Sequence, residues 1–495
     1  MTGHEHEKTV GELPSPSNGE SRVPKLLTRL AWLLFVGSLA VLFAQVVNGG
    51  PWQLAGLAVV DGLTVVMWVT VTFFSGIVHS YSRRYMAGSR AIDRFFAGVF
   101  AFTLVVMVLV AADSIVVFGL AWLVMGLVMA ELVGALRGWP QARAAASTAR
   151  RYFLASSALV GVALAMLWWH TGATTVSGVA SNVGSGQSAI VVLAAVILLL
   201  AAMVQSALLP FQTWLLASMT APTPASALMH SVFVNAGGIL LVRFAPVVTV
   251  DYRVMLAVLI VGAASALGGK LLKSVQADVK TQLGCSTVGQ MGFMIMQAGL
   301  GFFGAAITHL LLHGFYKAYH FLASGGQVAH ESPDPPASTA STGPLGVAVI
   351  VLTALAGGGV FATLTGKGTG LDSGLLLTLL VVLTVMHAAR EVVAAASVPA
   401  TVRYGAVPLI AIPALAVYAA VYNVVAGLLA GLPAVGGPAE LTAVHVLVAG
   451  AFVVAYLAIE SGAYRYSHRL YVALVNVTQP PAGTVLTSTE EYNEY

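Results

Sequence analysis

Long apolar stretches separated by short polar ones make up most of this chain. A helix needs about 20 mainly apolar residues to cross the hydrocarbon core of a bilayer. By that measure the pattern predicts fourteen spanning helices, at 30–47, 55–79, 95–111, 114–135, 152–169, 188–207, 224–246, 254–275, 282–300, 302–325, 344–364, 372–390, 405–430 and 441–460. We therefore expect an all-α polytopic membrane protein, with a membrane domain at 25–470 between a disordered polar tail at 1–24 and a polar C-terminal tail at 471–495.

Two stretches interrupt this pattern. Pro210, Pro222 and Pro224 fall between apolar runs, and a proline breaks or kinks the helix that contains it. Broken helices at membrane depth are tolerated where protein or a wet cavity satisfies the freed backbone groups. We therefore predict a discontinuous helix over 208–224, as in many ion-transporting folds. An interfacial loop between two ordinary helices is the alternative. The second interruption is a linker rich in Pro, Ser and Thr at 331–343.

Titratable residues also lie inside the apolar pattern. His309, His313 and Lys317 are spaced four apart, so a helix stacks them on one face. Titratable groups are costly in hydrocarbon and are typical of ion paths and proton relays. We therefore predict a proton relay along this stripe. The alternative is a set of helix-packing groups whose hydrogen bonds are satisfied.

Other polar residues extend the list of candidates. His230 follows the second proline pair, and neutral imidazole can both accept and donate a proton. Lys270 lies deep in an apolar helix, whereas Lys273 could instead extend its ammonium to the interface. We place His230, Lys270 and Lys273 in the candidate pathway, with Glu131 and Asp278 as candidate charge partners.

Charged residues near helix ends have simpler explanations. Asp61 and Asp113 flank predicted helix starts, where an acid complements the helix dipole. Glu460 is expected to be an end-of-helix charge. The polar cluster at 387–391 is either an ion exit or an interfacial anchor.

Composition and charge narrow the class further. The chain is 58% hydrophobic and 8% charged, whereas soluble domains carry about 25% charged residues. The single cysteine, Cys285, allows no disulfide framework and no cysteine-based metal site. Lysines and arginines concentrate in alternate loops, so the net charge of +4 indicates membrane orientation rather than nucleic-acid binding. We expect a cell (inner) membrane protein with both termini in the cytoplasm.

Several motifs within about 60–330 resemble one known superfamily. The motifs are Tyr81-Ser-Arg-Arg-Tyr-Met86, Leu209-Pro-Phe-Gln-Thr-Trp-Leu215, Ala221-Pro-Thr-Pro-Ala-Ser-Ala-Leu-Met-His230, Gln276-Ala-Asp-Val-Lys280, Cys285-Ser-Thr-Val-Gly-Gln-Met-Gly-Phe293 and His313-Gly-Phe-Tyr-Lys-Ala318. They resemble the proton-conducting antiporter-like subunits, which include subunit L of NADH:quinone oxidoreductase, the cation/proton antiporter subunits and the DabB subunits of inorganic carbon transporters.

The resemblance implies a fold and a route for protons. Family members have two inverted repeats of five helices, each with a broken helix, and conduct protons along a buried row of Lys, Glu and His. By resemblance, His230, Lys280, His313 and Lys317 belong to that row. Two positions depart from the respiratory subunits, with Leu123 in place of a glutamate and Gln205 in place of a lysine.

The local sequence is most similar to DabB. The resemblance therefore implies an ion-conducting subunit, for protons or alternatively sodium, coupled to a DabA-like, carbonic-anhydrase-like partner that holds zinc and hydrates CO2. No nucleotide-binding or zinc-protease motif occurs in the sequence, so we expect no active site, cofactor or metal in this chain. The alternatives are a proton-translocating subunit of a respiratory NADH:quinone oxidoreductase or related complex, and a non-conducting scaffold subunit.

Overall fold

Helices account for most of the described chain. The computed structural model describes residues 21–184, 188–324, 343–394, 399–462 and 467–481. The first half contains α1 (Val23–Asn48), α2 (Gly62–Tyr85), α3 (Ile92–Ala111), α4 (Ile115–Val133), α5 (Pro140–Thr171), α6 (Val176–Asn182), α7 (Ala189–Gln205), α8 (Thr213–Ala217), α9 (Thr223–Ser231), α10 (Ala236–Arg243) and α11 (Ala245–Val248). The second half contains α12 (Tyr252–Ser274), α13 (Val279–Gly299), α14 (Phe303–Ser324), α15 (Pro344–Thr365), α16 (Gly374–Ala394), α17 (Ala400–Leu429), α18 (Ala443–Glu460) and α19 (His468–Thr478).

The all-α, multi-pass prediction is confirmed. Each of the fourteen predicted segments coincides with a helix, namely α1 to α5, α7, the interrupted pair α9–α10, and α12 to α18. Eleven spans within the described residues are long and apolar enough to cross a membrane. α7 is apolar but has only 17 residues. α13 and α14 are not among the eleven. Their mean hydropathy is lower because each contains a lysine together with uncharged polar or histidine side chains.

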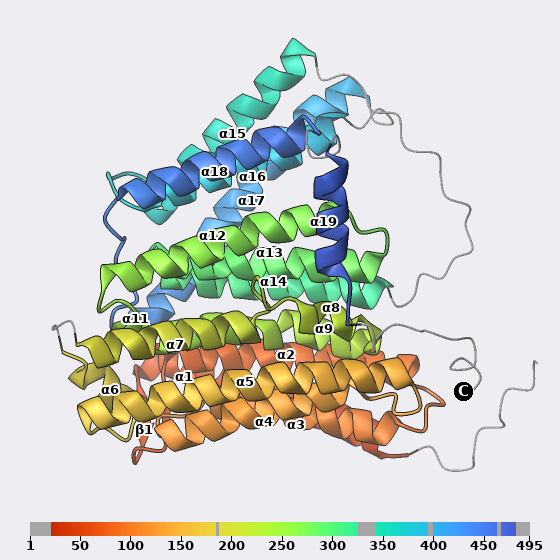
Figure 1. Ribbon diagram of the computed structural model, residues 1–495, viewed down its shortest axis with the longest axis vertical. Coiled ribbons are helices and arrows are strands. Elements are labelled where there is room, and N and C mark those ends of the chain that lie inside the picture. The colour runs from red at the N-terminus through yellow and green to blue at the C-terminus, as the bar shows by residue number, and fades with distance from the viewer. Residues whose placement is uncertain (1–20, 185–187, 325–342, 395–398, 463–466, 482–495) are drawn as a thin grey trace, which may run out of the picture.

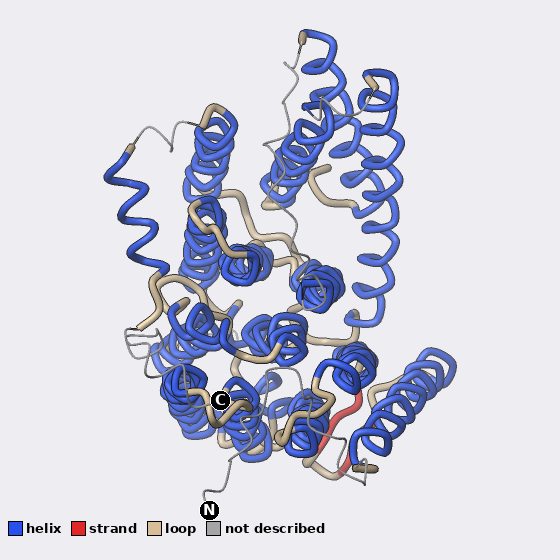
Figure 2. The backbone as a smooth tube through the Cα atoms, turned by 90° about the vertical axis from the view of Figure 1, so that its right-hand side faces the viewer, coloured by secondary structure: helices blue, strands red, loops and turns tan. Residues whose placement is uncertain are grey.

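The long helices lie side by side, and their ends form two opposite faces (Figure 1). The short hairpin of β1 (Trp52–Leu54) and β2 (Ala58–Val60) marks one face, which we call the hairpin end. The arginine-rich loops after α2 and α4 lie at the other, which we call the basic end. Figure 2 looks onto the basic end, where most helices of the lower half are seen along their axes. α12, α13 and α14 lie between the α1–α9 layers and α15–α18.

The predicted interruption at 208–224 is confirmed. α7 ends at Gln205, and only the five-residue α8 and a 3-10 turn, η1 (Ser218–Thr220), precede α9. Pro224 lies in the first turn of α9, where a missing N–H leaves no hydrogen bond unmade. Pro210 and Pro222 both lie outside the helices.

A further interruption, between α9 and α10, was not predicted, and the predicted linker at 331–343 lies almost wholly outside the described residues. The 3-10 turn η2 (Phe233–Asn235) separates α9 from α10 within a fully buried segment. The hydroxyl of Ser206 donates to the carbonyl of Val234 at 2.6 Å and accepts from the amide of Gly237 at 3.2 Å. The contact also requires a glycine, because a Cβ atom at Gly237 would lie 2.3 Å from Ser206 Oγ and 2.7 Å from the carbonyl oxygen of Ala202. In the second half, Pro408 and Pro413 lie inside α17, which continues through both.

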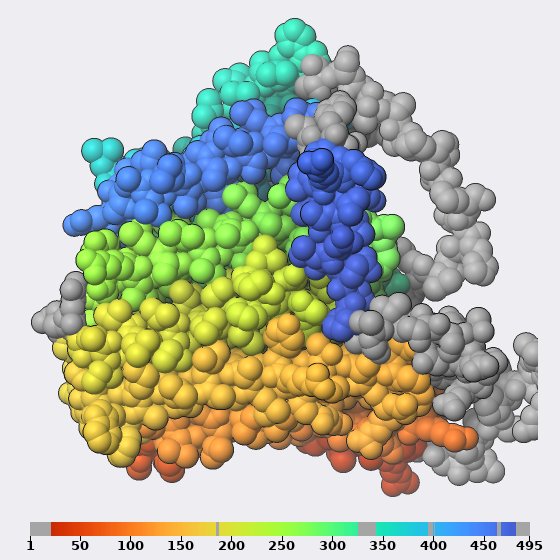
Figure 3. Space-filling view, in the orientation of Figure 1, coloured from red at the N-terminus to blue at the C-terminus, as the bar shows by residue number. Residues whose placement is uncertain are grey.

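α19 corrects part of the prediction for the C-terminal region. The sequence analysis assigned 471–495 to a polar tail, but 468–478 form a helix that begins at Ser467, whose hydroxyl accepts from the amide of Leu470. The apolar residues of this helix had been grouped with the polar sequence that follows it. α19 lies on the side of the bundle close to the basic end, where it crosses in front of α12 (Figure 3). The rest of the tail, 482–495, and residues 1–20 lie outside the described residues.

Candidate functional site: a buried polar row

Lys317 of α14 lies in the interior with its side chain fully enclosed. Its Nζ donates a 2.7 Å hydrogen bond to the carbonyl oxygen of Leu283 on α13. Among the described residues no carboxylate pairs with this lysine. A lysine buried without a counter-charge is expensive, and such residues mark ion paths more often than packing sites.

His313 and His309 continue the stripe from Lys317 toward the hairpin end, as their spacing predicts. Their rings are stacked, with centroids 5.8 Å apart and planes inclined by 14°. Within the described chain, neither ring nitrogen of His313 has a hydrogen-bond partner, and Nε2 of His309 has none either. Buried polar atoms normally find a partner, and ordered water is the usual one where protein supplies none.

His230 extends the row into the discontinuous segment. Its ring is fully buried and stacks on Phe321 of α14, one turn beyond Lys317, with centroids 4.3 Å apart. Nδ1 hydrogen-bonds to Thr287 Oγ1 at 2.9 Å, while Nε2 has no partner among the described residues. The broken helix thus places an imidazole against the lysine-bearing face of α14.

A cavity of about 570 Å³, the central cavity, opens beside the two stacked histidines. Its walls come from α12, α13, α14, α16, α17 and α18. His309, His313, Lys270 and Lys273 all line it. The cavity therefore brings four of the predicted pathway residues to one space, including Lys273, for which an interfacial position was the alternative.

Lys270, the deeper of the two lysines on α12, connects the central cavity to a buried carboxylate. Lys270 Nζ lies 2.9 Å from His387 Nε2, and His387 Nδ1 lies 2.6 Å from Glu460 Oε1. Glu460 also pairs with Arg390. Glu460 is the last residue of α18, as expected of an end-of-helix charge, and its side chain is only 12% exposed, so this acid faces inward. Helix ends are poor guides to side-chain direction, which explains why the sequence reasoning undervalued Glu460.

Lys280 and Asp278 lie at the basic end of α13. Lys280 Nζ donates to the carbonyls of Met219 and Ala221, at 3.4 and 3.1 Å, which belong to the interruption before α9. Asp278 caps α13, accepting from the backbone amides of Lys280 and Thr281 at 2.9 and 3.0 Å. In the described chain no ion pair within 4 Å joins it to a lysine side chain, and its role as a charge partner stays a prediction.

Glu131 approaches basic partners, but at the surface. Its carboxylate lies 2.6 Å from Arg150 and 3.4 Å from Arg137, with 54% of the side chain exposed. An exposed pair of this kind contributes about 0–1 kcal/mol and cannot serve the buried row. Glu131 therefore differs from the buried pathway residues, because its ion pairs lie at the exposed surface.

Leu123 and Gln205, the two positions that differ from the respiratory subunits, lie in an apolar region. Leu123 is half-buried, and Gln205 is buried with both amide atoms lacking partners among the described residues. Phe153, Trp214 and Phe233 pack edge to face nearby along α5, α8 and η2, with centroids 4.7 to 5.8 Å apart. The side chains that pack near Gln205 are thus mainly aromatic, whereas the polar row runs through α12, α14, α16 and α18.

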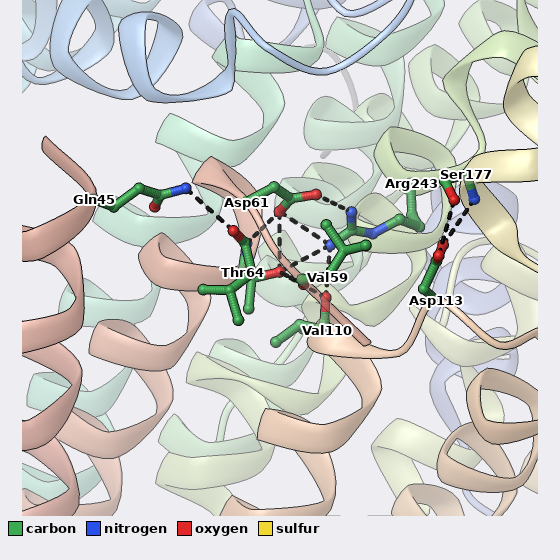
Figure 4. Close-up of polar contacts among 9 residues, drawn as sticks. Gln45, Val59, Asp61, Thr64, Val110, Asp113, Ser177 and Arg243 are labelled. Carbon is green, nitrogen blue, oxygen red and sulfur yellow. Dashed lines mark hydrogen bonds and ion pairs between the residues drawn. The ribbon is translucent and has the colours of Figure 1, made fainter. Parts of the chain in front are cut away.

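A buried ion pair at the hairpin end was missed by the sequence reasoning. Asp61 caps α2 as expected, but it also pairs with Arg243 of α10 (Figure 4). Arg243 further donates to the carbonyl of Val110 at 2.6 Å and to Thr64 Oγ1 at 3.2 Å. A lone arginine inside an apolar run was the available signal. Asp113 likewise binds the first turn of α6, through Ser177, rather than the helix it precedes.

The fold and the buried row define an antiporter-like membrane subunit. Residues 112–403 match the family described as NADH:quinone oxidoreductase/Mrp antiporter, TM, and residues 53–96 match the N-terminus of chain 5 of NADH-ubiquinone oxidoreductase (complex I). Because the first match covers more than half of the chain, the chain belongs to this family, a family of cation-antiporter-like membrane subunits.

Two groups of curated relatives are similar to this chain. A probable inorganic carbon transporter subunit DabB1 from Halothiobacillus neapolitanus is 38% identical over 284 residues, covering 56% of this chain and 50% of that protein. NADH-quinone oxidoreductase subunit L from Mycobacterium tuberculosis is 34% identical over 283 residues, covering 56% and 44%. The chain spans about half the length of the curated relatives it matches.

Solved structures share the fold. A chain of the Mrp complex from Dietzia sp. DQ12-45-1b superposes with a TM-score of 0.61 at 20% identity, over 92% of this chain and 57% of that one. A chain of the membrane-bound sulfane sulfur reductase, an archaeal respiratory membrane complex, gives 0.56 at 16% identity, over 93% of each. Both solved structures are of complexes, and their likeness to this chain shows the shared fold.

Proposed function

We propose that this chain is the proton-conducting membrane subunit of a DabAB-like inorganic carbon transporter. The basic end faces the cytoplasm of a cell membrane, following the bias of Lys and Arg in the loops. Protons enter by the Lys270–His387–Glu460 contacts and pass through the central cavity to the stacked histidines. Sodium is the alternative ion.

The observation that carries this proposal is the continuous polar row in the second half. It runs from Glu460 through His387 and Lys270 to a cavity, and from the cavity to His313. Each of these side chains can hold or release a proton, and the cavity has room for connecting water. His313, whose ring nitrogens lack partners among the described residues, is one of the residues that line this cavity.

The partner in this proposal is a zinc-bearing subunit that hydrates CO2 to bicarbonate, with proton flow driving the reaction in one direction. The relatives named as inorganic carbon transporter subunits support this choice. Zinc is assigned to the partner because the described residues hold no group of three or more His, Cys, Asp and Glu side chains able to bind a metal.

Purification of the tagged protein from native membranes, with mass spectrometry and zinc analysis, tests the partner. We expect one stoichiometric zinc-bearing subunit resembling a carbonic anhydrase. Recovery of flavin and iron–sulfur subunits would contradict the proposal and place this chain in a respiratory complex. That second function is favoured by the match to subunit L from M. tuberculosis. An unrelated tagged membrane protein, purified in the same detergent, serves as the background control.

A further inference from the structure

The hairpin end holds a second enclosed lysine that the proposed entry route does not use. Lys367 lies in the loop between α15 and α16 and is only 6% exposed. Its Nζ donates to the hydroxyl of Tyr422 on α17 and lies 4.6 Å from the ring centroid of Phe302. Burial lowers the pKa of Lys367 to about 8, against the opposing effect of the Asp372 carboxylate. This ammonium can therefore release and recover a proton near neutral pH.

Lys367 and Tyr422 line a cavity of about 430 Å³, the outer cavity. Asp372 also lines it, and backbone bridges join Phe302 to Gly436 and Asp372 to Glu440. The loops after α13, α15 and α17 are thus tied together around one space. The outer cavity lies at the hairpin end, opposite the Lys270–His387–Glu460 contacts.

Tyr418 provides the link between the two cavities. It precedes Tyr422 by four residues, so both side chains project from one face of α17. Tyr418 lines the central cavity together with His309 and His313, whereas Tyr422 lines the outer cavity. The side chain of Gln297 on α13, which is buried, contacts Tyr418.

We propose that Tyr418, Tyr422 and Lys367 form the outer end of the proton route, joining the central cavity to the outer cavity. The proposal rests on the proposed function and specifies where its protons leave or enter at the hairpin end. Tyrosine hydroxyls and an amine each both donate and accept protons, so this ladder continues the chemistry of the histidine row.

The proton transfer balances with water as the only other reactant. The Lys367 ammonium releases a proton to water in the outer cavity, and the resulting amine takes the proton of the Tyr422 hydroxyl. Water between Tyr422 and Tyr418 returns a proton to Tyr422. That water in turn receives a proton from the central cavity. Only N–H and O–H bonds break and form, and each side chain returns to its starting charge. Asp372 on the cavity wall favours the charged form of Lys367.

Flux in proteoliposomes separates this inference from the function on which it rests. The full chain, co-purified with its partner, is reconstituted with an internal pH dye and driven by a potassium diffusion potential. Lys367→Met and Tyr422→Phe are each expected to slow proton flux about tenfold or more, a barrier increase of the size expected when one relay step is lost. Arg253→Met, an exposed cation at the same end, is the matched control and keeps the wild-type rate.

The outcomes are distinct. If the wild type conducts and Lys317→Met does not, but both ladder variants match the wild type, the outer route is wrong while the proposed function stands. If the wild type does not conduct, the proposed function fails and this inference fails with it.

Accessibility of the outer cavity gives a second test that needs no flux. Cys285 is the single cysteine in the chain and is buried, so Cys285→Ser supplies a cysteine-free background. In it, Lys367→Cys is expected to react with a small membrane-impermeant thiol reagent added from the hairpin side. Phe361→Cys, at a position 1% exposed, is the unreactive control. A Lys367→Cys variant as unreactive as that control would overturn the inference, because water could not reach the ladder.

Discussion

Asp61 and Arg243 neutralise each other inside the protein, whereas within the described chain Lys317 donates only to the carbonyl of Leu283. The two arrangements have different consequences at the scale of single residues. A paired and hydrogen-bonded charge is held in one state, and removing either partner leaves the other uncompensated. A lysine without a carboxylate can change its protonation state at lower cost, which suits a relay rather than a structural tie.

Asp61→Asn is expected to lower the free energy of unfolding by about 3–5 kcal/mol, because it leaves the Arg243 guanidinium buried and uncompensated. Thermal unfolding of the detergent-solubilised protein measures the change. The double variant Asp61→Asn/Arg243→Met is the control, and it should recover much of the loss because no charge remains. Equal stability of Asp61→Asn and the wild type would show that the pair is not buried as described.

Gln205→Leu is expected to leave proton flux unchanged. Gln205 replaces the lysine of the family, both of its amide atoms lack partners among the described residues, and the aromatic cluster of Phe153, Trp214 and Phe233 lies along this half. Removing an unsatisfied buried amide should cost no stability and could add about 1–3 kcal/mol. A loss of flux in reconstituted Gln205→Leu, with expression intact, would place the conducting route in the first half after all.

At the scale of elements, hydropathy predicted the helices well because each span must satisfy its own backbone hydrogen bonds in lipid. Proline positions likewise predicted the interruption before α9. The η2 break could not be predicted, because it depends on Ser206 from a different segment bonding to Val234 and Gly237. The same holds for the site: the stripe on α14 follows from its spacing, but Thr287 and Glu460 join it only through tertiary packing.

α12 and α13 approach each other through glycines. A Cβ atom at Gly292 would lie 2.4 Å from the amide nitrogen of Ala266 and 2.7 Å from the carbonyl oxygen of Gly262. Backbone atoms cannot move aside as a flexible side chain can, so the helices must separate. These two helices carry Lys270, Lys280 and Thr287, so their spacing also sets the geometry of the row.

Gly292→Ala is therefore expected to lower the free energy of unfolding by about 1–3 kcal/mol and to reduce flux. Thermal unfolding and reconstituted transport measure the two effects. Gly359→Ala on α15 is the matched control, since nothing lies within 4 Å of its added methyl group. Alanine favours a helix more than glycine does, so an equal gain in stability in the two variants would show that helix propensity outweighs the α12–α13 contact.

At the scale of the whole molecule, α12–α14 lie between the N-terminal helices and α15–α18, and the polar row lies where α12–α14 meet α9 on one side and α16 and α18 on the other (Figure 1). The family to which the chain belongs explains the architecture, while the residues of this chain decide which half can conduct. The central cavity collects side chains from six helices, so its chemistry is a property of the assembled bundle.

The central claim is that protons cross the protein by the buried polar row, in which Lys317 continues the α14 stripe of His309 and His313. Its most direct test is proton flux in proteoliposomes holding the co-purified protein, comparing the wild type with Lys317→Met and with the exposed control Arg253→Met. We expect the wild type and the control to conduct equally, and Lys317→Met to fall to the rate of protein-free liposomes while inserting normally. Flux retained by Lys317→Met would contradict the account, because the fully enclosed lysine would then be a packing residue.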